Sequence, residues 1–187
     1  LTGLNKDQLS AVTRVEGPLL ILAGAGSGKT RVITYRIAHM IEDLKISPYS
    51  ILAITFTNKA AKEMKERVNA LIGDRAKDMW ISTFHSLCVR ILRRDIERIG
   101  YNRSFVIYDT QDQLSLIKEC IKECGLREDS FKPSSVLSAI SGAKDKLLNP
   151  KAFEARYFND FRLSKISKVY DLYQRKLKSN NALDFDD

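Results

Sequence analysis

The chain has 187 residues, 44% hydrophobic and 29% charged, a composition typical of a soluble globular protein. It has no run of about 18 apolar residues and no secretory start, so we expect a cytoplasmic protein that does not enter a membrane. The net charge of +8 is uneven, because residues 1–105 hold 17 Lys and Arg against 10 Asp and Glu, whereas residues 106–187 hold 14 against 13. A basic excess on one folded part favours a polyanionic partner such as nucleic acid.

The first part of the chain alternates short apolar runs with helical patterns. The runs at 18–23, 51–56, 79–82 and 105–108 predict four short strands. Between them, apolar residues at helical spacing predict helices that begin at Lys29, at Asn58 as a cap and at His85. Strands and helices that alternate in this way indicate an α/β fold, with a parallel sheet flanked by helices.

The pattern becomes helical after Asp109. Thr110 and Gln113 predict a capping box for a helix that ends at Gly125, and further helices are expected over 133–148 and 164–178. No strand signal of comparable strength occurs there. The sequence therefore predicts an all-helical second part that begins near residue 109.

The cysteines argue against a disulfide framework. There are three, Cys88, Cys120 and Cys124, and an odd number fits neither paired disulfides nor a four-ligand zinc site. Cys120 and Cys124 are one helical turn apart, so we expect them to be packing thiols.

The sharpest motif is AGAGSGKT at residues 23–30, between the expected strand at 18–23 and the helix that begins at Lys29. Backbone N–H groups converge on a phosphate only where glycines permit unusual φ values. We expect Lys29 to reach the β and γ phosphates of ATP and Thr30 to bind Mg²⁺, as the catalytic pair. The predicted nucleotide-binding residues in the loop are Ala23, Gly24, Ala25, Gly26, Ser27, Gly28, Lys29 and Thr30. The alternative is a glycine-rich turn without a ligand.

Three further segments carry a resemblance to a known family. They are LNKDQ at 4–8, TFTNKAAKEM at 55–64 and STFHSLCVRILRR at 82–94. With the loop, they resemble motifs of the UvrD/Rep/PcrA group of superfamily 1 DNA helicases, most closely its PcrA branch, over essentially the whole chain. The resemblance implies a RecA-like P-loop NTPase fold. In that fold, residues 1–108 form the N-terminal part of motor subdomain 1A, 109–180 the helical subdomain 1B, and 181–187 the start of the return to 1A.

The resemblance also implies roles for individual residues. Gln8 would read the adenine edge and Arg31 would lie near the nucleotide, although Asn5 and Gln8 suit a helix capping box equally well. The implied contacts with single-stranded DNA are Phe56, Thr57, Asn58, Lys59, Thr83, Phe84 and His85. A ring such as Phe56 offers a face for base stacking. The alternatives are a core phenylalanine before an ordinary capped helix, and a capping or packing role for His85.

The implied function is that of the N-terminal portion of an ATP-dependent 3′–5′ helicase. Its partners would be single-stranded and partly duplex DNA in repair and replication, in the bacterial cytosol and at the nucleoid. The sequence does not identify its protein partners. Two rivals stay open. One is a P-loop enzyme of another class, such as a small-molecule kinase, and the other is a non-catalytic nucleic-acid-binding module with a vestigial loop.

ATP hydrolysis also needs an acidic strand end and an arginine. FVIYD, which ends in Asp109, lacks a following Glu, and LDFDD, with Asp184, Asp186 and Asp187, has no expected strand before it. In the family, the acidic motif, the arginine fingers and the second motor domain come later in the sequence. We therefore expect these 187 residues to be a fragment that binds nucleotide weakly and does not hydrolyse it.

Overall fold

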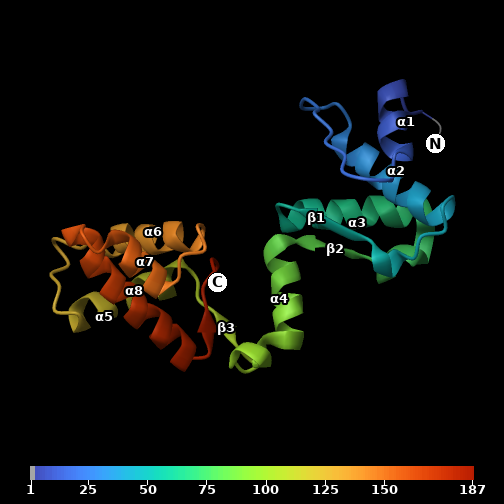
Figure 1. Ribbon diagram of the computed structural model, residues 1–187. Coiled ribbons are helices and arrows are strands. Elements are labelled where there is room, and N and C mark those ends of the chain that lie inside the picture. Colours follow the sequence, from blue (N-terminus) through green and yellow to red (C-terminus); the bar gives the residue numbers. More distant parts are fainter. Residues whose placement is uncertain (1–2) are drawn as a thin grey trace. The chain divides into compact units, whose positions relative to one another are not determined.

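The computed structural model describes residues 3–187, which separate into two units, residues 3–90 and 91–187 (Figure 1). The elements that begin in the first unit are α1 (Lys6–Thr13), α2 (Lys29–Glu42), η1 (Pro48–Ser50), β1 (Leu52–Thr55), α3 (Asn58–Ile72), η2 (Gly73–Asp78), β2 (Trp80–Thr83) and α4 (Phe84–Asp95). Those of the second unit are η3 (Ile96–Ile99), β3 (Val106–Ile107), α5 (Thr110–Glu123), α6 (Pro133–Lys144), α7 (Pro150–Tyr157), α8 (Phe161–Ser179) and β4 (Ala182–Leu183).

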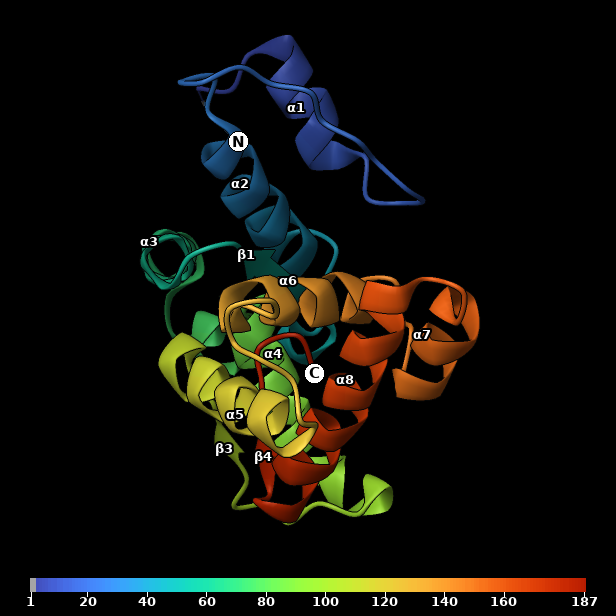
Figure 2. The same ribbon diagram turned by 90° about the vertical axis from the view of Figure 1, so that its left-hand side faces the viewer.

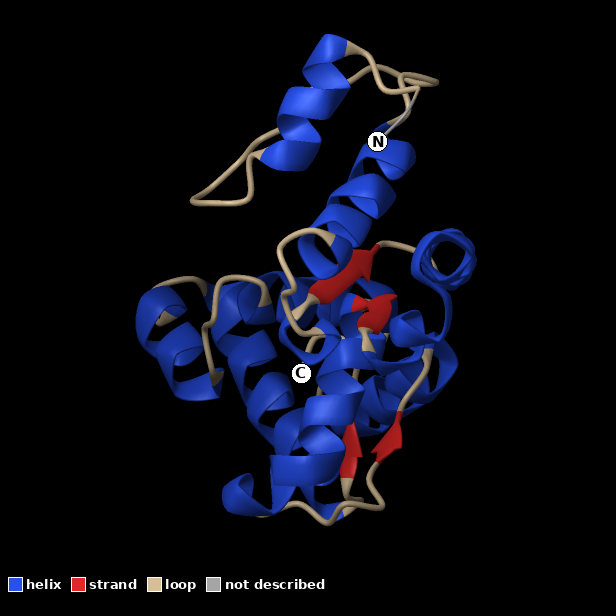
Figure 3. Cartoon of the chain, turned by 90° about the vertical axis from the view of Figure 1, so that its right-hand side faces the viewer, coloured by secondary structure: helices blue, strands red, loops and turns tan. Residues whose placement is uncertain are grey.

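A β1–α3–β2 crossover forms the centre of the first unit. The two strands pair in parallel, from Leu52 opposite Trp80 to Thr55 opposite Thr83, and they lie side by side in Figure 3. Helix α3 packs against both strands and against α2. The buried apolar residues at this junction are Ile37, Ile41, Ile51, Ala53, Met64, Val68, Ile72, Ala76 and Met79. This crossover confirms the predicted parallel α/β arrangement on a small scale.

The expected strand at 18–23 is wrong. The segment has no regular structure, and Leu20 and Leu22 are exposed. A strand exists only when a neighbouring backbone accepts and donates its hydrogen bonds. Within residues 3–187, β1 and β2 pair only with each other, and the segment joins neither of their open edges. Apolar composition alone did not determine its structure.

Two helix caps lie one residue earlier than expected. Thr57, not Asn58, caps α3, because its hydroxyl accepts the N–H of Ala60 at 3.1 Å. Asp109 caps α5, and its carboxylate accepts the N–H groups of Gln111 and Asp112 at 2.7 and 3.0 Å. In both cases a side-chain oxygen placed before the first turn satisfies N–H groups that the helix leaves unpaired.

The second unit is a helical cluster with a two-residue parallel sheet. Strand β3 pairs with β4, with Val106 opposite Ala182 and Ile107 opposite Leu183. The strand expected at 105–108 therefore lies in the second unit, and a strand that was not expected precedes Asp184. The subdomain boundary at residue 108 stays a prediction, because these units reflect packing within this chain alone.

Four helices, α5 to α8, build the core of the second unit (Figure 2). Their buried side chains include Ile117, Ile121, Val136, Ile140, Phe153, Val169, Tyr173 and Leu177. The helix expected over 133–148 ends at Lys144, and α7, which was not expected, begins at Pro150 with Asn149 as its cap. Within residues 3–187 no helix combines the length and apolarity that a membrane crossing needs.

The cysteines occupy two kinds of environment, and this leads to a first testable prediction. Cys120 is buried and Cys124 half-buried, as expected, and burial raises the pKa of the Cys120 thiol to about 12. Cys88 is exposed. Because the thiolate is the reactive form, we expect iodoacetamide at pH 8 to alkylate Cys88 rapidly and Cys120 hardly at all. Peptide mass spectrometry would measure this. In guanidinium all three should react, and fast labelling of native Cys120 would contradict the burial.

Candidate functional site

Glycines shape the turn that leads into α2. Gly28 is the N-cap of this helix, with a φ of 87°, and Gly26 has a φ of 75°. Residues other than glycine rarely adopt such backbone φ angles. A Cβ atom at Gly28 would also lie 3.1 Å from the Nε2 atom of Gln8. The loop therefore needs glycine at these two positions, as its motif predicts.

The Lys29 side chain folds back over this loop. Its ammonium donates to the carbonyl oxygens of Ala23 and Gly24, at 3.0 and 2.7 Å, while the Ser27 hydroxyl also donates to Gly24, at 2.8 Å. The half-buried Thr30 follows in the first turn of α2, and no hydrogen bond within residues 3–187 uses its hydroxyl. A cation, a hydroxyl and a helix N-terminus thus meet at one place, which suits a phosphate group.

Gln8 connects α1 to the loop. It forms the capping box with Asn5, accepting the Asn5 N–H at 3.1 Å while its own N–H donates to the Asn5 side chain at 2.9 Å. Its Nε2 atom donates to the Ser27 carbonyl at 3.0 Å. The capping reading of Gln8 is confirmed, and its role at adenine stays a prediction. Arg31 is exposed, with its guanidinium 5.3 Å from the ring centroid of Tyr35.

A hollow of about 330 Å³ lies at this junction. Its walls include Gln8, Leu22, Gly24, Ser27 and Lys29, so α1, the loop and the start of α2 all contribute. A larger hollow, of about 520 Å³, lies between α5, α7 and α8 in the second unit. We assign the candidate nucleotide site to the smaller hollow, because the glycine loop, the Lys29 ammonium and the N-terminus of α2 converge there.

Two aromatic rings lie at the carboxyl edge of the first sheet. Thr55 and Thr83 are opposite each other in the parallel pair, so Phe56 and Phe84 both follow the same end of the sheet. Phe56 is 94% exposed and Phe84 59% exposed. The alternative of a core phenylalanine at position 56 is therefore wrong, and the structure brings together two motifs that are separated in the sequence.

Polar residues lie close to both rings in the sequence. Asn58 and Lys59 are exposed in the first turn of α3. Thr83 is buried, and its hydroxyl donates to the Ser86 hydroxyl at 2.9 Å and accepts the Ser86 N–H at 3.3 Å. Its side chain thus secures the start of α4. His85 is exposed in the first turn of the same helix.

Comparison with known proteins decides the family. The family model described as UvrD/REP helicase N-terminal domain matches residues 4–187. The chain belongs to the UvrD/REP helicase family. It is 56% identical over 187 residues to ATP-dependent DNA helicase PcrA of Bacillus subtilis and 52% identical over 187 residues to that of Staphylococcus aureus. The PcrA helicase of Staphylococcus epidermidis is 53% identical over 184 residues. The chain spans about a quarter of the length of these relatives, 25 or 26% of each.

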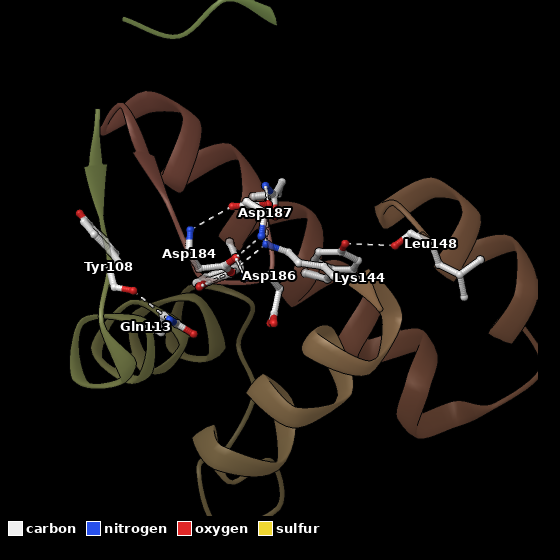
Figure 4. Close-up of polar contacts among 10 residues, drawn as sticks. Tyr108, Gln113, Lys144, Leu148, Asp184, Asp186 and Asp187 are labelled. Atoms are coloured by element: carbon white, nitrogen blue, oxygen red, sulfur yellow. Dashed lines mark hydrogen bonds and ion pairs between the residues drawn. The ribbon is translucent and has the colours of Figure 1, made fainter. Parts of the chain in front are cut away.

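The acidic segment LDFDD serves the packing of this UvrD/REP helicase chain. The Lys144 ammonium lies 2.7 Å from both Asp184 and Asp187 (Figure 4). The Tyr173 hydroxyl donates to Asp184 at 2.9 Å. Burial and the Asp184 charge raise the pKa of Tyr173. Sequence reasoning missed this cluster, because nothing local associates Lys144 with a carboxylate 40 positions later in the sequence. Asp109, in the other acidic segment, caps α5.

Proposed function

We propose that this chain is the ATP- and DNA-binding N-terminal portion of an ATP-dependent DNA helicase. The whole protein would move 3′ to 5′ along single-stranded DNA and separate partly duplex DNA, in repair and replication in the bacterial cytoplasm and at the nucleoid. The observation that carries the proposal is a family match over residues 4–187 in a chain whose glycine loop opens α2. Residues 1–108 and 181–187 would belong to motor subdomain 1A of a RecA-like fold, and 109–180 to subdomain 1B.

ATP would lie against the loop from Ala23 to Thr30. Lys29 would bind the β and γ phosphates, since its ammonium already lies at the mouth of the loop. Gln8 would contact the edge of the adenine base, and Arg31 would lie near the nucleotide. Ala25 and Gly26 would contribute backbone N–H groups.

Mg²⁺ fits the site as a companion of the triphosphate. Within residues 3–187 no three His, Cys, Asp or Glu side chains gather as metal ligands. The Thr30 hydroxyl, in the first turn of α2, would be its protein ligand, and Mg²⁺ typically combines few protein ligands with phosphate oxygens and water. When bound, it would neutralise charge on the phosphates.

Single-stranded DNA would cross the carboxyl edge of β1 and β2. Phe56 and Phe84 would stack against bases, because both rings are exposed and follow the same end of the paired strands β1 and β2. Lys59 and the first N–H groups of α3, next to Thr57 and Asn58, would hold a phosphate. The Thr83 backbone and His85 would line the same path.

We expect Phe56→Ala to weaken binding of a fluorescent oligothymidylate by about tenfold, since base stacking on an aromatic side chain contributes about 1–3 kcal/mol. Fluorescence anisotropy over a salt series would measure the affinity. The matched control is Tyr49→Ala, which removes an exposed ring from η1, ahead of β1.

The outcome separates the rival functions. A small-molecule kinase predicts no salt-dependent oligonucleotide binding. A vestigial module predicts DNA binding without magnesium-dependent nucleotide affinity. In the longer protein, the helicase predicts ATP-driven strand displacement from a duplex with a 3′ tail and none from one with a 5′ tail.

A further inference from the structure

The most exposed large apolar side chains of the second unit all belong to one helical hairpin. Leu147, Phe161 and Phe158 are 92%, 78% and 69% exposed, whereas no other large apolar residue described within 91–187 exceeds 60%. All three belong to residues 146–168, the loop before α7, α7 itself and the first half of α8, which we call the α7–α8 hairpin. The two helices pack against each other and are joined by a short turn (Figure 2). Such a concentration of exposed apolar surface is typical of an interaction site.

The same hairpin carries the positive charge of its unit. Residues 146–168 contain six lysines and arginines against two acidic residues, whereas the rest of 91–187 contains twelve against thirteen. The near-neutral second part is therefore polarised. The six basic residues are Lys146, Lys151, Arg156, Arg162, Lys165 and Lys168. None of them takes part in an ion pair within residues 3–187. Lys151 and Lys168 line a hollow that also contains Glu123, Glu154 and Asp171.

The turn that presents the two rings is fixed by its own contacts. Asp160 caps α8 by accepting the N–H of Leu163 at 2.8 Å, and its own N–H donates to the Tyr157 carbonyl at 3.0 Å. Arg162 donates to the carbonyl of Ser130 at 2.9 Å and so ties the corner to the loop before α6. Phe158 and Phe161 flank this turn, one ending α7 and the other opening α8.

These two rings are not needed by the core. Phe153 and Tyr157 supply the inward aromatic contacts of α7, with ring centroids 4.8 Å apart, and Phe153 also meets Tyr170 at 6.0 Å. The Lys165 ammonium lies 5.6 Å from the Phe161 ring centroid, which places a cation beside an exposed ring. A turn that Asp160 and Arg162 hold in place, with two exposed rings and the Lys165 cation beside one of them, resembles a stacking platform more than a packing element.

We propose that the α7–α8 hairpin is a second DNA-contacting surface, which binds an unpaired strand by stacking bases on Phe158 and Phe161 and pairing phosphates with Arg156, Lys151 and Lys165. The inference rests on the proposed function but concerns a different unit from the Phe56 edge. Nucleic acid fits better than an apolar protein face, because an unpaired strand offers flat rings and regularly spaced negative charges together.

Photo-crosslinking of the 187-residue chain to an oligonucleotide that carries 5-iododeoxyuridine tests this directly. Peptide mapping should find crosslinks at Phe158 or Phe161. The double variant Phe158→Ala/Phe161→Ala should bind the oligonucleotide about tenfold more weakly. The matched control, Ile99→Ala, removes another exposed apolar side chain of the same unit and should leave the affinity unchanged.

Charge is tested separately. Lys151→Gln combined with Arg156→Gln should make the slope of log K against log salt shallower by about 1.4, roughly 0.7 for each cation removed from a single-strand contact. Lys122→Gln, an exposed lysine on α5, is the control. An unchanged slope in the hairpin variant would contradict the phosphate contacts.

The crosslink pattern distinguishes this inference from the proposed function. Crosslinks at Phe56 or Phe84 alone, with unaltered affinity in the hairpin variants, would overturn the inference and leave the helicase assignment intact. Crosslinks in the hairpin alone would support it and remove the DNA path at the sheet edge. If the hairpin substitutions changed only the sedimentation coefficient of the chain, they would reveal a contact between protein chains and would overturn the inference. If the chain bound no DNA at all, both the inference and the proposed function would be overturned.

Discussion

Replacing Lys29 by alanine will weaken the binding of MgATP by about a hundredfold. The Lys29 ammonium lies within 3.0 Å of two carbonyl oxygens of the loop, so it is held beside the place that the phosphates would occupy and can exchange these bonds for bonds to phosphate oxygens. A hydrogen bond to a charged group contributes about 1.5–3 kcal/mol, and two such bonds to phosphate oxygens correspond to about two powers of ten in affinity. Titration with a fluorescent ATP analogue in the presence of Mg²⁺ would measure the loss.

Three further variants define how specific that loss is. Lys6→Ala removes an exposed lysine from α1, close in sequence to Gln8, and should leave the affinity nearly unchanged, because its charge lies outside the loop. Thr30→Ala should abolish the magnesium dependence and leave a weak, metal-independent affinity, whereas Thr30→Ser should retain it. If Lys29→Ala and Lys6→Ala bound MgATP equally well, the loop from Ala23 to Thr30 would not be the phosphate site.

Local patterns predicted the elements whose causes are local. Helices α2 and α3 follow the periodicity of their apolar residues, and α3 ends where Gly73 takes a positive φ of 65°. The P-loop was predictable because its glycines, its lysine and the helix after it are contiguous. The N-caps of α3 and α5 each lie one residue before the residue that the sequence suggested. Thr57 and Asp109 precede the first helical residue, so their side chains, and not those of Asn58 and Thr110, accept the free N–H groups of the first turn.

Pairings between distant segments had no local signal. The run at 18–23 looked like a strand because of its apolar composition, which shows neither that a partner strand is present nor that the run is buried. Ala182 and Leu183 form a strand with few apolar neighbours in the sequence, because β3 lies beside them. The candidate site shows the same division. Phe56 was singled out by its motif, yet only the register of β1 and β2 places it beside Phe84.

Replacing Lys144 by methionine will lower the free energy of unfolding of the second unit by about 3–5 kcal/mol. The Lys144 side chain is 6% exposed and lies 2.7 Å from Asp184 and Asp187, which are 1% and 13% exposed. Methionine fills similar space but leaves two buried carboxylates without their cation. Asp184 keeps its bonds from Tyr173 and from the N–H groups of Asp186 and Asp187, so the penalty comes from lost charge compensation. Hydrogen exchange of α6 and α8 amides across a urea series would measure it.

The chain offers a control that differs from Lys144 mainly in burial. Lys176 also pairs with two carboxylates, those of Glu119 and Glu123 at 2.6 and 2.7 Å, but these glutamates are 57% and 49% exposed. Water can solvate them once the cation is gone, so Lys176→Met should cost far less. Combining Lys144→Met with Asp184→Asn should cost less than the sum of the two single changes, because the second removes a charge that the first left uncompensated. Equal losses for the two lysine variants would show that the distances, and not the burial, determine the stability of such pairs in this protein.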